Sequence, residues 1–152
     1  MMTKKWELFV DGASRGNPGA SGAGIYFRHG TQSIAKRGYF LGKKTNNEAE
    51  YLALLIGLFV AKKYGDSSSI HVYSDSQLLI RQLNGEYKVR KPELQKLHKL
   101  VTDAAASFTC SFTHVCREDN QEADRLANEG VDKKTTLPLS FISLLATHEI
   151  YI

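Results

Sequence analysis

Four acidic residues lie where a charged side chain needs an explanation: Asp11, Glu50, Asp75 and Asp124. Asp11 follows the apolar run LFV, and Asp75 follows IHVYS in the same way. If the two segments are neighbouring parallel strands, both acids emerge at the carboxyl edge of a sheet, where open α/β folds bind ligands. Glu50 is the only charged residue of AEYLALLIGLFVA at 49–61. Such a segment must be largely buried, and a buried carboxylate needs a cation or strong donors.

These acids suggest a metal site, because their own segments carry no matching basic cluster that could pair with them. Asp124 lies near the start of the last predicted helix, beside apolar Ala123, Leu126 and Ala127. Carboxylate oxygens are hard ligands, and the sequence offers no paired Cys or clustered His. Such a ligand set favours Mg²⁺, with Mn²⁺ also possible, over Zn²⁺.

Each acid also has a purely structural explanation. Asp11 can cap a turn, Asp75 can cap the helix that follows it, and Asp124 can favour a helix N-terminal dipole. Glu48 lies close to Glu50 in the sequence but about 200° round the helix, so it is not expected in the cluster. The residues alone leave these alternatives open.

The apolar pattern predicts an α/β domain with a mixed sheet of five strands flanked by helices. Three strands joined by short turns predict an antiparallel meander, and the later strands alternate with helices. The expected strands are 5–10, 22–28, 32–41, 67–75 and 108–115. The expected helices are 47–64, 76–85, one beginning at Pro92, and one capped by Asn120 that ends at Gly130.

Composition limits the class of protein. The chain has 152 residues, 42% of them apolar, which suffices for one domain with its own core. Its net charge is +4, with basic residues gathered at 36–44 and 88–99. Modest basicity fits a polyanionic partner without requiring one. The start resembles no export signal, and the apolar stretch at 49–61 is too short to cross a bilayer. We therefore expect a cytoplasmic protein, no membrane partner and a monomer.

Four motifs occur in order along the chain: DGASRGNPG at 11–19, TNNEAEY at 45–51, YSDSQ at 73–77 and REDNQEADRLAN at 117–128. No single motif is decisive, but together and in this spacing they resemble type 1 ribonuclease H. The resemblance covers nearly all of residues 5–131.

The resemblance implies a ribonuclease H-like fold and endonucleolytic cleavage of the RNA strand of an RNA–DNA hybrid. It implies two Mg²⁺ ions as cofactors, and products with a 5′ phosphate and a 3′ hydroxyl. Carried over by position, the catalytic, metal-binding carboxylates of the family fall on Asp11, Glu50, Asp75 and Asp124.

Substrate contacts are expected from neutral polar residues. Asn17, Asn46, Asn47 and Gln77 match family positions that contact the minor groove. Amide side chains both donate to and accept from a 2′-hydroxyl, which separates RNA from DNA. Thr45 resembles part of a phosphate contact to the DNA strand. The asparagines can equally serve as turn and cap residues.

The chain departs from many family members in two places. The basic protrusion, an extra helix rich in Lys, Arg and Trp, is reduced to GEYKVRK at 85–91, which puts substrate grip in question. The loop before the last catalytic acid, which often carries a mobile histidine, is shortened to CREDN at 116–120. Arg117 takes the place of the histidine if the alignment is gapped, whereas His114 takes it if the alignment is ungapped. We favour Arg117, because His114 continues a strand pattern.

Residues 137–152 lie beyond the region of resemblance and form a tail after a domain at 1–136. The tail is too apolar to remain free in water, so we expect it to dock on the domain. Its end, EIYI, could add an edge strand or cover an apolar patch, and docking on a second copy is the alternative.

Two other classes of function remain open. The chain could be a catalytically silent module that binds hybrids, or another nuclease built on the same sheet, such as a junction resolvase or a 3′ exonuclease. The retained acids count against the first class, because they repel phosphate unless metal is bound. The asparagines count against the second class.

Overall fold

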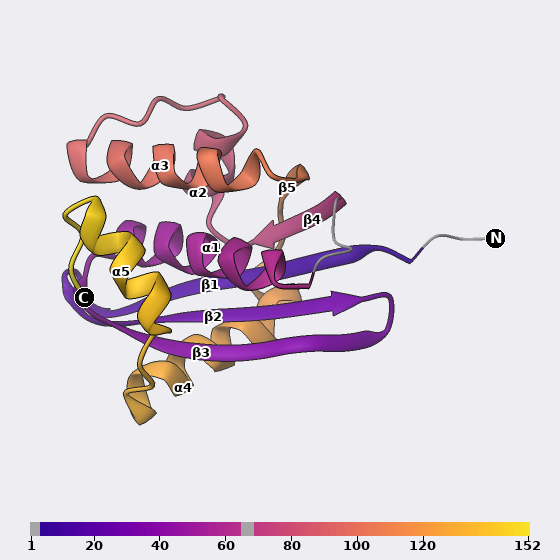
Figure 1. Cartoon of the computed structure of the whole chain (residues 1–152), viewed down its shortest axis with the longest axis horizontal. Helices are drawn as coiled ribbons and strands as arrows, with labels where there is room; N and C mark the ends of the chain where they lie inside the picture. The colour runs from indigo at the N-terminus through magenta and orange to yellow at the C-terminus, as the bar shows by residue number, and fades with distance from the viewer. Residues whose placement is uncertain (1–3, 65–68) are drawn as a thin grey trace.

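The protein folds around one five-stranded sheet with the strand order β3-β2-β1-β4-β5 (Figure 1). The computed structural model describes residues 4–64 and 69–152. β1 pairs with β2 and β2 with β3 antiparallel, whereas β1 pairs with β4 and β4 with β5 parallel. The strands are β1 (Trp6–Gly16), β2 (Gly19–His29), β3 (Gln32–Lys44), β4 (Ser69–Ser74) and β5 (Thr109–His114). The predicted mixed sheet is confirmed.

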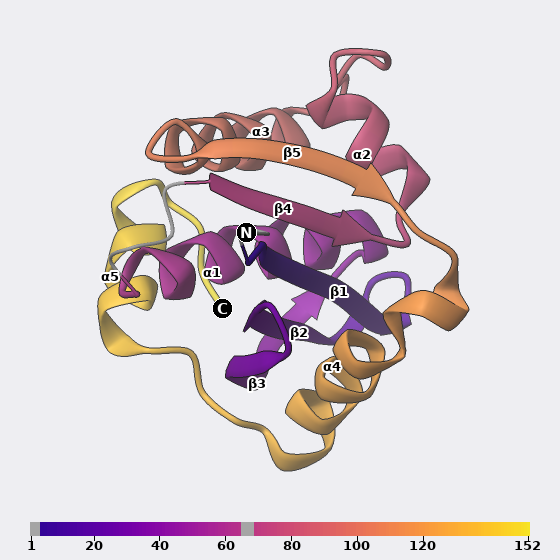
Figure 2. The same ribbon diagram turned by 90° about the vertical axis from the view of Figure 1, so that its right-hand side faces the viewer.

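Helices cover both faces of the sheet, with α1 and α4 on opposite sides (Figure 2). α1 packs on β1 and β2 and is itself covered by α3, and α4 packs on β2 and β3. None of the described helices is long and apolar enough to cross a membrane. The helices are α1 (Asn46–Lys62), α2 (Gln77–Leu83), α3 (Pro92–Ala105), α4 (Gln121–Lys133) and α5 (Leu139–Thr147), with a 3-10 turn, η1 (Arg117–Asn120), before α4.

α1 is the central helix of the core. Almost every residue from Ala49 to Ala61 is buried, which agrees with the apolar run in the sequence. Its start is fixed by a capping box, in which the Thr45 hydroxyl accepts from the Glu48 N–H and the Glu48 carboxylate accepts from the Thr45 N–H. This pairing satisfies two otherwise free backbone donors. Glu50 is thereby held at a fixed place on the buried helix.

β1 is longer than the sequence predicted, so Asp11 does not end the strand. The antiparallel register with β2 continues from Asp11 to Gly16, opposite Gly19. The parallel register with β4 stops earlier, with Val10 opposite Ser74. Asp11 therefore lies just beyond the point where β4 leaves β1. The turn to β2 instead forms at Asn17 and Pro18, between Gly16 and Gly19.

α4 also runs past its predicted end. Gly130 was expected to terminate the helix, but the helix continues to Lys133 and Lys134 adopts the left-handed conformation. A Cβ atom on Gly130 would lie 2.5 Å from the backbone nitrogen of Tyr39. The glycine is therefore explained by close packing of α4 on β3, and the termination prediction was wrong.

Other boundaries shift by a few residues. α1 ends at Lys62, before the predicted 64, and β4 ends at Ser74, before the predicted 75. The predicted strand at 67–75 includes residues 67 and 68, which lie outside the described residues. The shortened loop before α4 forms the 3-10 turn η1.

The tail contains a helix that the sequence analysis did not predict. α5 places Phe141 and Leu145 in the core, and both are fully buried. The Phe141 ring meets the Phe59 ring of α1 edge-on, with centroids 5.3 Å apart. Residues 149–152 form no strand, so the suggested edge strand is absent. The chain end instead reaches β3, where Lys44 Nζ donates to the Tyr151 carbonyl at 2.5 Å.

Candidate active site

Asp11, Glu50 and Asp75 come together at the end of the parallel part of the sheet. Each offers a carboxylate oxygen, and these oxygens lie within 4.8 Å of one another. Asp11 and Glu50 are buried, and Asp75 is half-buried. Residues from β1, α1 and the β4–α2 junction thus share one small volume.

Gly12 allows the first two acids to meet. A Cβ atom at this position would lie 2.4 Å from the Ala49 carbonyl oxygen, so only glycine lets β1 approach α1 this closely. The Gly12 N–H donates a short hydrogen bond to Glu50 Oε1. The backbone beside Asp11 therefore fixes the orientation of the Glu50 carboxylate.

Asp75 is placed by the abrupt end of β4. The Ser76 N–H donates to Ser74 Oγ at 3.0 Å, and Ser76 Oγ accepts from the Leu79 N–H at 3.2 Å. Ser76 is thus the N-cap of α2. The alternative in which Asp75 caps this helix is wrong, and its carboxylate faces the other acids.

Asp124 joins the group from α4, on the other side of the sheet. It is close enough to Asp11 to influence the pKa of that residue. The Asn128 side-chain amide donates to the Asp124 carbonyl at 3.0 Å and lies 3.5 Å from its Oδ1. Arg117 Nη2 lies 3.9 Å from the same Oδ1. Asp124 is therefore half-buried and, of the four acids, the one that has a basic neighbour among the described residues.

The cluster is electrostatically unfavourable as it stands. Burial raises the pKa of Asp11, and the charges of Glu50 and Asp75 raise it further. Burial also raises the pKa of Glu50, although the Gly12 N–H opposes this effect. Among the described residues no Lys, Arg or His forms an ion pair with Asp11, Glu50 or Asp75. A cation held between these oxygens would relieve both the repulsion and the cost of burial.

The donor set fits a hard divalent cation. It consists of carboxylate oxygens on rigid elements, with no thiolate or imidazole among the three residues that converge. Mg²⁺ and Mn²⁺ prefer such ligands, and keep water or substrate oxygens in the remaining positions. An open cavity of about 500 Å³ beside the acids leaves room for those positions.

The same cavity contains most of the residues that the sequence singled out. Both His114, the last residue of β5, and Arg117, the first of η1, line it, and both are exposed. Either side chain could therefore contact a phosphate group bound in this cavity. The cavity is lined by Asp11, Gly12, Ala13, Ser14, Asn46, Asn47, Glu50, Asp75, Ser76, His114, Val115, Cys116, Arg117 and Asp124.

The residues predicted to contact substrate do not all line the same cavity. Asn46 and Asn47 line the main cavity, and Asn47 also lines a smaller hollow of about 160 Å³ with Asn17 and Thr45. Asn17 Oδ1 accepts from the Asn46 N–H at 3.0 Å, so it also has a structural role. Gln77 is exposed at the start of α2 and lines neither hollow.

Sequence reasoning missed several supporting residues. It identified neither the Gly12 N–H as a donor to Glu50 nor Asn128 as a neighbour of Asp124. The i,i+4 spacing of Asp124 and Asn128 is the one signal that could have suggested the second contact. Asn120 occupies the predicted N-cap position of α4, but its side chain makes no capping hydrogen bond.

Comparisons with known proteins show which family the chain resembles. Residues 9–130 match the family described as "Reverse transcriptase-like". Ribonuclease HI from Halobacterium salinarum is 40% identical over 126 residues, which are 82% of this chain and 63% of that protein. The chain spans 34% of relatives from Mycobacterium bovis and Mycobacterium tuberculosis. It thus covers less than two thirds of the first curated relatives.

The chain covers a larger share of the solved structures that it resembles. The crystal structure of RNase H1 from Halobacterium salinarum superposes with a TM-score of 0.81 at 37% identity, covering 85% of this chain and 98% of that one. LC11-RNase H1 in complex with RNA/DNA hybrid has a TM-score of 0.81 at 33% identity, with the same coverage. The fold, the order of the motifs and these relatives together show that the chain belongs to the type 1 ribonuclease H family, in a short form without the basic protrusion.

Proposed function

We propose that this protein is a metal-dependent endonuclease that hydrolyses the RNA strand of RNA–DNA hybrids. The observation that carries the proposal is the convergence of Asp11, Glu50 and Asp75, without a basic partner among the described residues, beside an open cavity. The similarity to LC11-RNase H1, whose structure contains an RNA/DNA hybrid, supports this choice of substrate. The proposed products carry a 5′ phosphate and a 3′ hydroxyl.

Asp11, Glu50, Asp75 and Asp124 would hold two divalent cations. When bound, such a pair activates the attacking water and stabilises the leaving 3′ oxygen in an in-line displacement at phosphorus. The chain itself supplies negative ligands on elements that are fixed by the sheet and by the α1 capping box. The raised pKa values of Asp11 and Glu50 mean that these acids release protons when they bind metal.

Selection of the RNA strand is assigned to amide side chains near the cavity. Asn46 and Asn47 line the same cavity as the acids, and Asn17 and Thr45 line the smaller hollow together with Asn47. Amides can donate to and accept from a 2′-hydroxyl without reading the base sequence. Thr45 lies next to Lys43 and Lys44, which suits a phosphate of the DNA strand. Gln77 is retained as an outer contact from α2.

The proposal is tested by cleavage of end-labelled RNA–DNA hybrid, duplex DNA and duplex RNA in Mg²⁺, with a chelator as control. We expect internal cleavage of the hybrid RNA, and analysis of the ends should find the 5′ phosphate. Binding without cleavage would identify a silent hybrid-binding module. Cleavage of duplex DNA in preference to hybrid would identify another nuclease of the same fold.

A further inference from the structure

The two peptide groups that flank Asp11 are both held by side chains from other elements. On one side, the Gly12 N–H donates to Glu50 Oε1 of α1. On the other side, the Val10 carbonyl accepts from Asn120 Nδ2 at 2.9 Å. The first contact belongs to the carboxylate cluster. The second comes from a residue with no metal-binding or capping role.

Asn120 connects the start of α4 to the strand that carries Asp11. It is the last residue of η1 and lies four residues before Asp124, which is about one helical turn. Its partner, Val10, is the last residue of β1 in parallel register with β4. The hydrogen bond therefore joins the backbone beside one proposed metal ligand to the helix that carries another.

The Asn120 amide is held in a costly environment. The residue is 1% exposed, and its Oδ1 has no hydrogen-bond partner within the described part of the chain. A buried polar atom without a partner destabilises a protein. The amide must keep this orientation, because only Nδ2 can donate to the Val10 carbonyl. The unpartnered Oδ1 offsets the stability gained from the Nδ2 hydrogen bond, so we look for the contribution of this amide in the connection it makes between β1 and α4.

We propose that Asn120 is a positioning residue that sets the separation of Asp11 and Asp124, and with it the affinity of the metal site. The inference rests on the proposed function, because it assumes that both acids bind the cations. Asn120 does not line the cavity beside the acids. It holds the main chain of β1 through the Val10 carbonyl, before Asp11, just as the Glu50 carboxylate holds it through the Gly12 N–H, after Asp11.

The direct test is titration of the protein with Mg²⁺ alone, by calorimetry or by NMR shifts. Outer partners of metal ligands typically contribute about 10–100-fold to metal affinity or activity. We therefore expect Asn120→Ala to weaken Mg²⁺ binding about 10-fold or more. In hybrid cleavage, kcat should fall while KM changes little, because the substrate contacts are intact.

A second variant separates the hydrogen bond from packing. Asn120→Leu keeps a similar side-chain volume and removes both the donor and the unpartnered oxygen. We expect it to be more stable than Asn120→Ala, yet to bind Mg²⁺ equally poorly. Recovery of wild-type Mg²⁺ affinity in Asn120→Leu would overturn the inference, because packing alone would then suffice.

Gln82 provides a matched control. It is also a buried amide, 6% exposed, and its Oε1 accepts from the Tyr51 hydroxyl at 2.6 Å. Gln82→Ala should lower the melting temperature without changing Mg²⁺ affinity. If Asn120→Ala behaves in the same way, Asn120 is only structural and the inference fails.

A double-mutant cycle tests the link to Asp124. In an Asp124→Asn background, Asn120→Ala should have little further effect on Mg²⁺ affinity, because the ligand that it positions is already impaired. Fully additive effects would contradict the proposal. These binding measurements do not depend on hybrid cleavage. A wild-type protein that binds Mg²⁺ but cleaves no hybrid would reject the proposed function, and the Mg²⁺ titrations of the variants would still decide the role of Asn120.

Discussion

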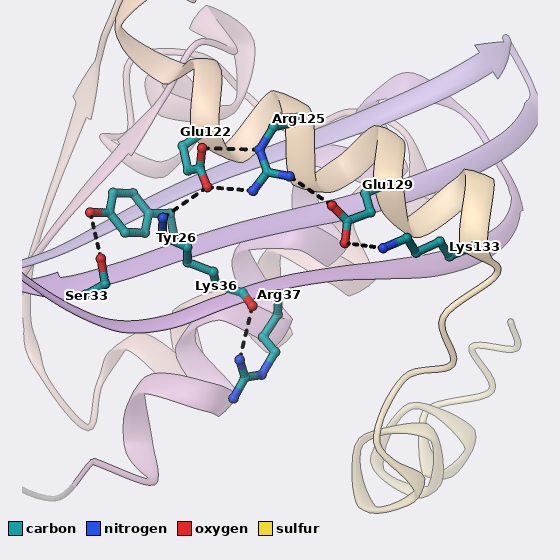
Figure 3. A network of polar contacts seen from close by, with 8 residues as sticks. All are labelled: Tyr26, Ser33, Lys36, Arg37, Glu122, Arg125, Glu129 and Lys133. Atoms are coloured by element: carbon teal, nitrogen blue, oxygen red, sulfur yellow. Dashed lines mark hydrogen bonds and ion pairs between the residues drawn. The ribbon is translucent and has the colours of Figure 1, made fainter.

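The two sides of α4 face carboxylates in opposite electrostatic environments. On the outer side, Glu122 and Glu129 alternate with basic residues in a continuous network (Figure 3). Arg125 bridges both acids, at 2.7 Å and 2.9 Å, and Lys36 and Lys133 complete the ends at 3.4 Å and 3.2 Å. Hydrogen bonding to Arg125 lowers the pKa of Glu122, and hydrogen bonding to Lys133 lowers that of Glu129.

On the inner side, Asp124 faces acids that have no such partners. The pKa values of Asp11 and Glu50 are raised, chiefly by burial. Basic side chains of the protein therefore neutralise the outer acids, Glu122 and Glu129. Among the described residues, no basic side chain forms an ion pair with the inner acids, Asp11, Glu50 and Asp75. This contrast separates carboxylates that stabilise a surface from carboxylates that a bound cation would stabilise.

The largest effect is expected from removing one of the inner acids. Asp11→Asn, Glu50→Gln or Asp75→Asn should lower hybrid cleavage by at least about 10³-fold, because each variant loses a metal ligand. The metal-free variant should unfold at the same or a higher temperature, because repulsion in the cluster is reduced. Cleavage assays and thermal melts without metal measure the two effects.

Glu48→Gln is the matched control for Glu50→Gln. The Glu48 carboxylate accepts from the Thr45 N–H in the capping box, and a glutamine oxygen can do the same. Cleavage should be nearly unchanged. A large loss there, or near-normal turnover after Glu50→Gln, would show that the wrong glutamate was assigned.

The next effect concerns pH. A carboxyl group with a raised folded-state pKa adds stability below its unfolded pKa and loses that stability as pH rises toward the folded value. For Asp11 and Glu50 the loss begins above the ordinary values of 3.8 and 4.5. The metal-free protein should therefore melt at lower temperature as pH rises from about 5 to 8, and Mg²⁺ should restore stability most at the upper end.

Asp11→Asn tests the origin of this pH dependence. If the inner acids cause it, the variant should show a flatter dependence of melting temperature on pH and a smaller stabilisation by Mg²⁺. An unchanged slope would assign the dependence to other groups.

The inner acids were accessible to sequence reasoning because each conflicts with its local context. A carboxylate in the buried helix 49–61, or directly after an apolar strand, lacks an evident local partner. The supporting contacts were not accessible, because they depend on tertiary approach. The Asn120 amide meets a carbonyl 110 residues away. Gly130 resembles a helix terminator until β3 is placed beside it.

The same limit applies to element boundaries. β1 continues past Asp11 because β2 pairs with it as far as Gly16, which local glycine content does not reveal. α5 is a nine-residue helix whose Phe141 fills a place beside α1. Short isolated helices are marginal in water, so packing and not propensity decides this one.

A smaller effect is expected at the mouth of the cavity. Arg117 lies 3.9 Å from Asp124 and is a permanent positive charge, suited to a scissile or product phosphate. Loss of a hydrogen bond to a charged group costs about 1.5–3 kcal/mol, so Arg117→Ala should lower turnover about 10-fold or more. His114→Ala should have less effect. The reverse order in steady-state assays would favour the ungapped alignment.

The smallest effect is expected on the outer side of α4. Glu122→Gln removes one charge from a largely exposed network, and exposed ion pairs typically contribute about 0.2–1 kcal/mol. The pKa of Glu122 is lowered, so its effect on stability changes with pH in the opposite direction to that of Asp11 and Glu50. Glu122 stabilises the fold at neutral pH, and this stabilisation is lost as pH falls below the ordinary value of 4.5. We expect a small decrease in melting temperature at neutral pH, weaker at high salt, with Mg²⁺ affinity and cleavage unchanged. A strong loss of cleavage would mean that the outer network also positions Asp124, and that the two sides of α4 are not independent.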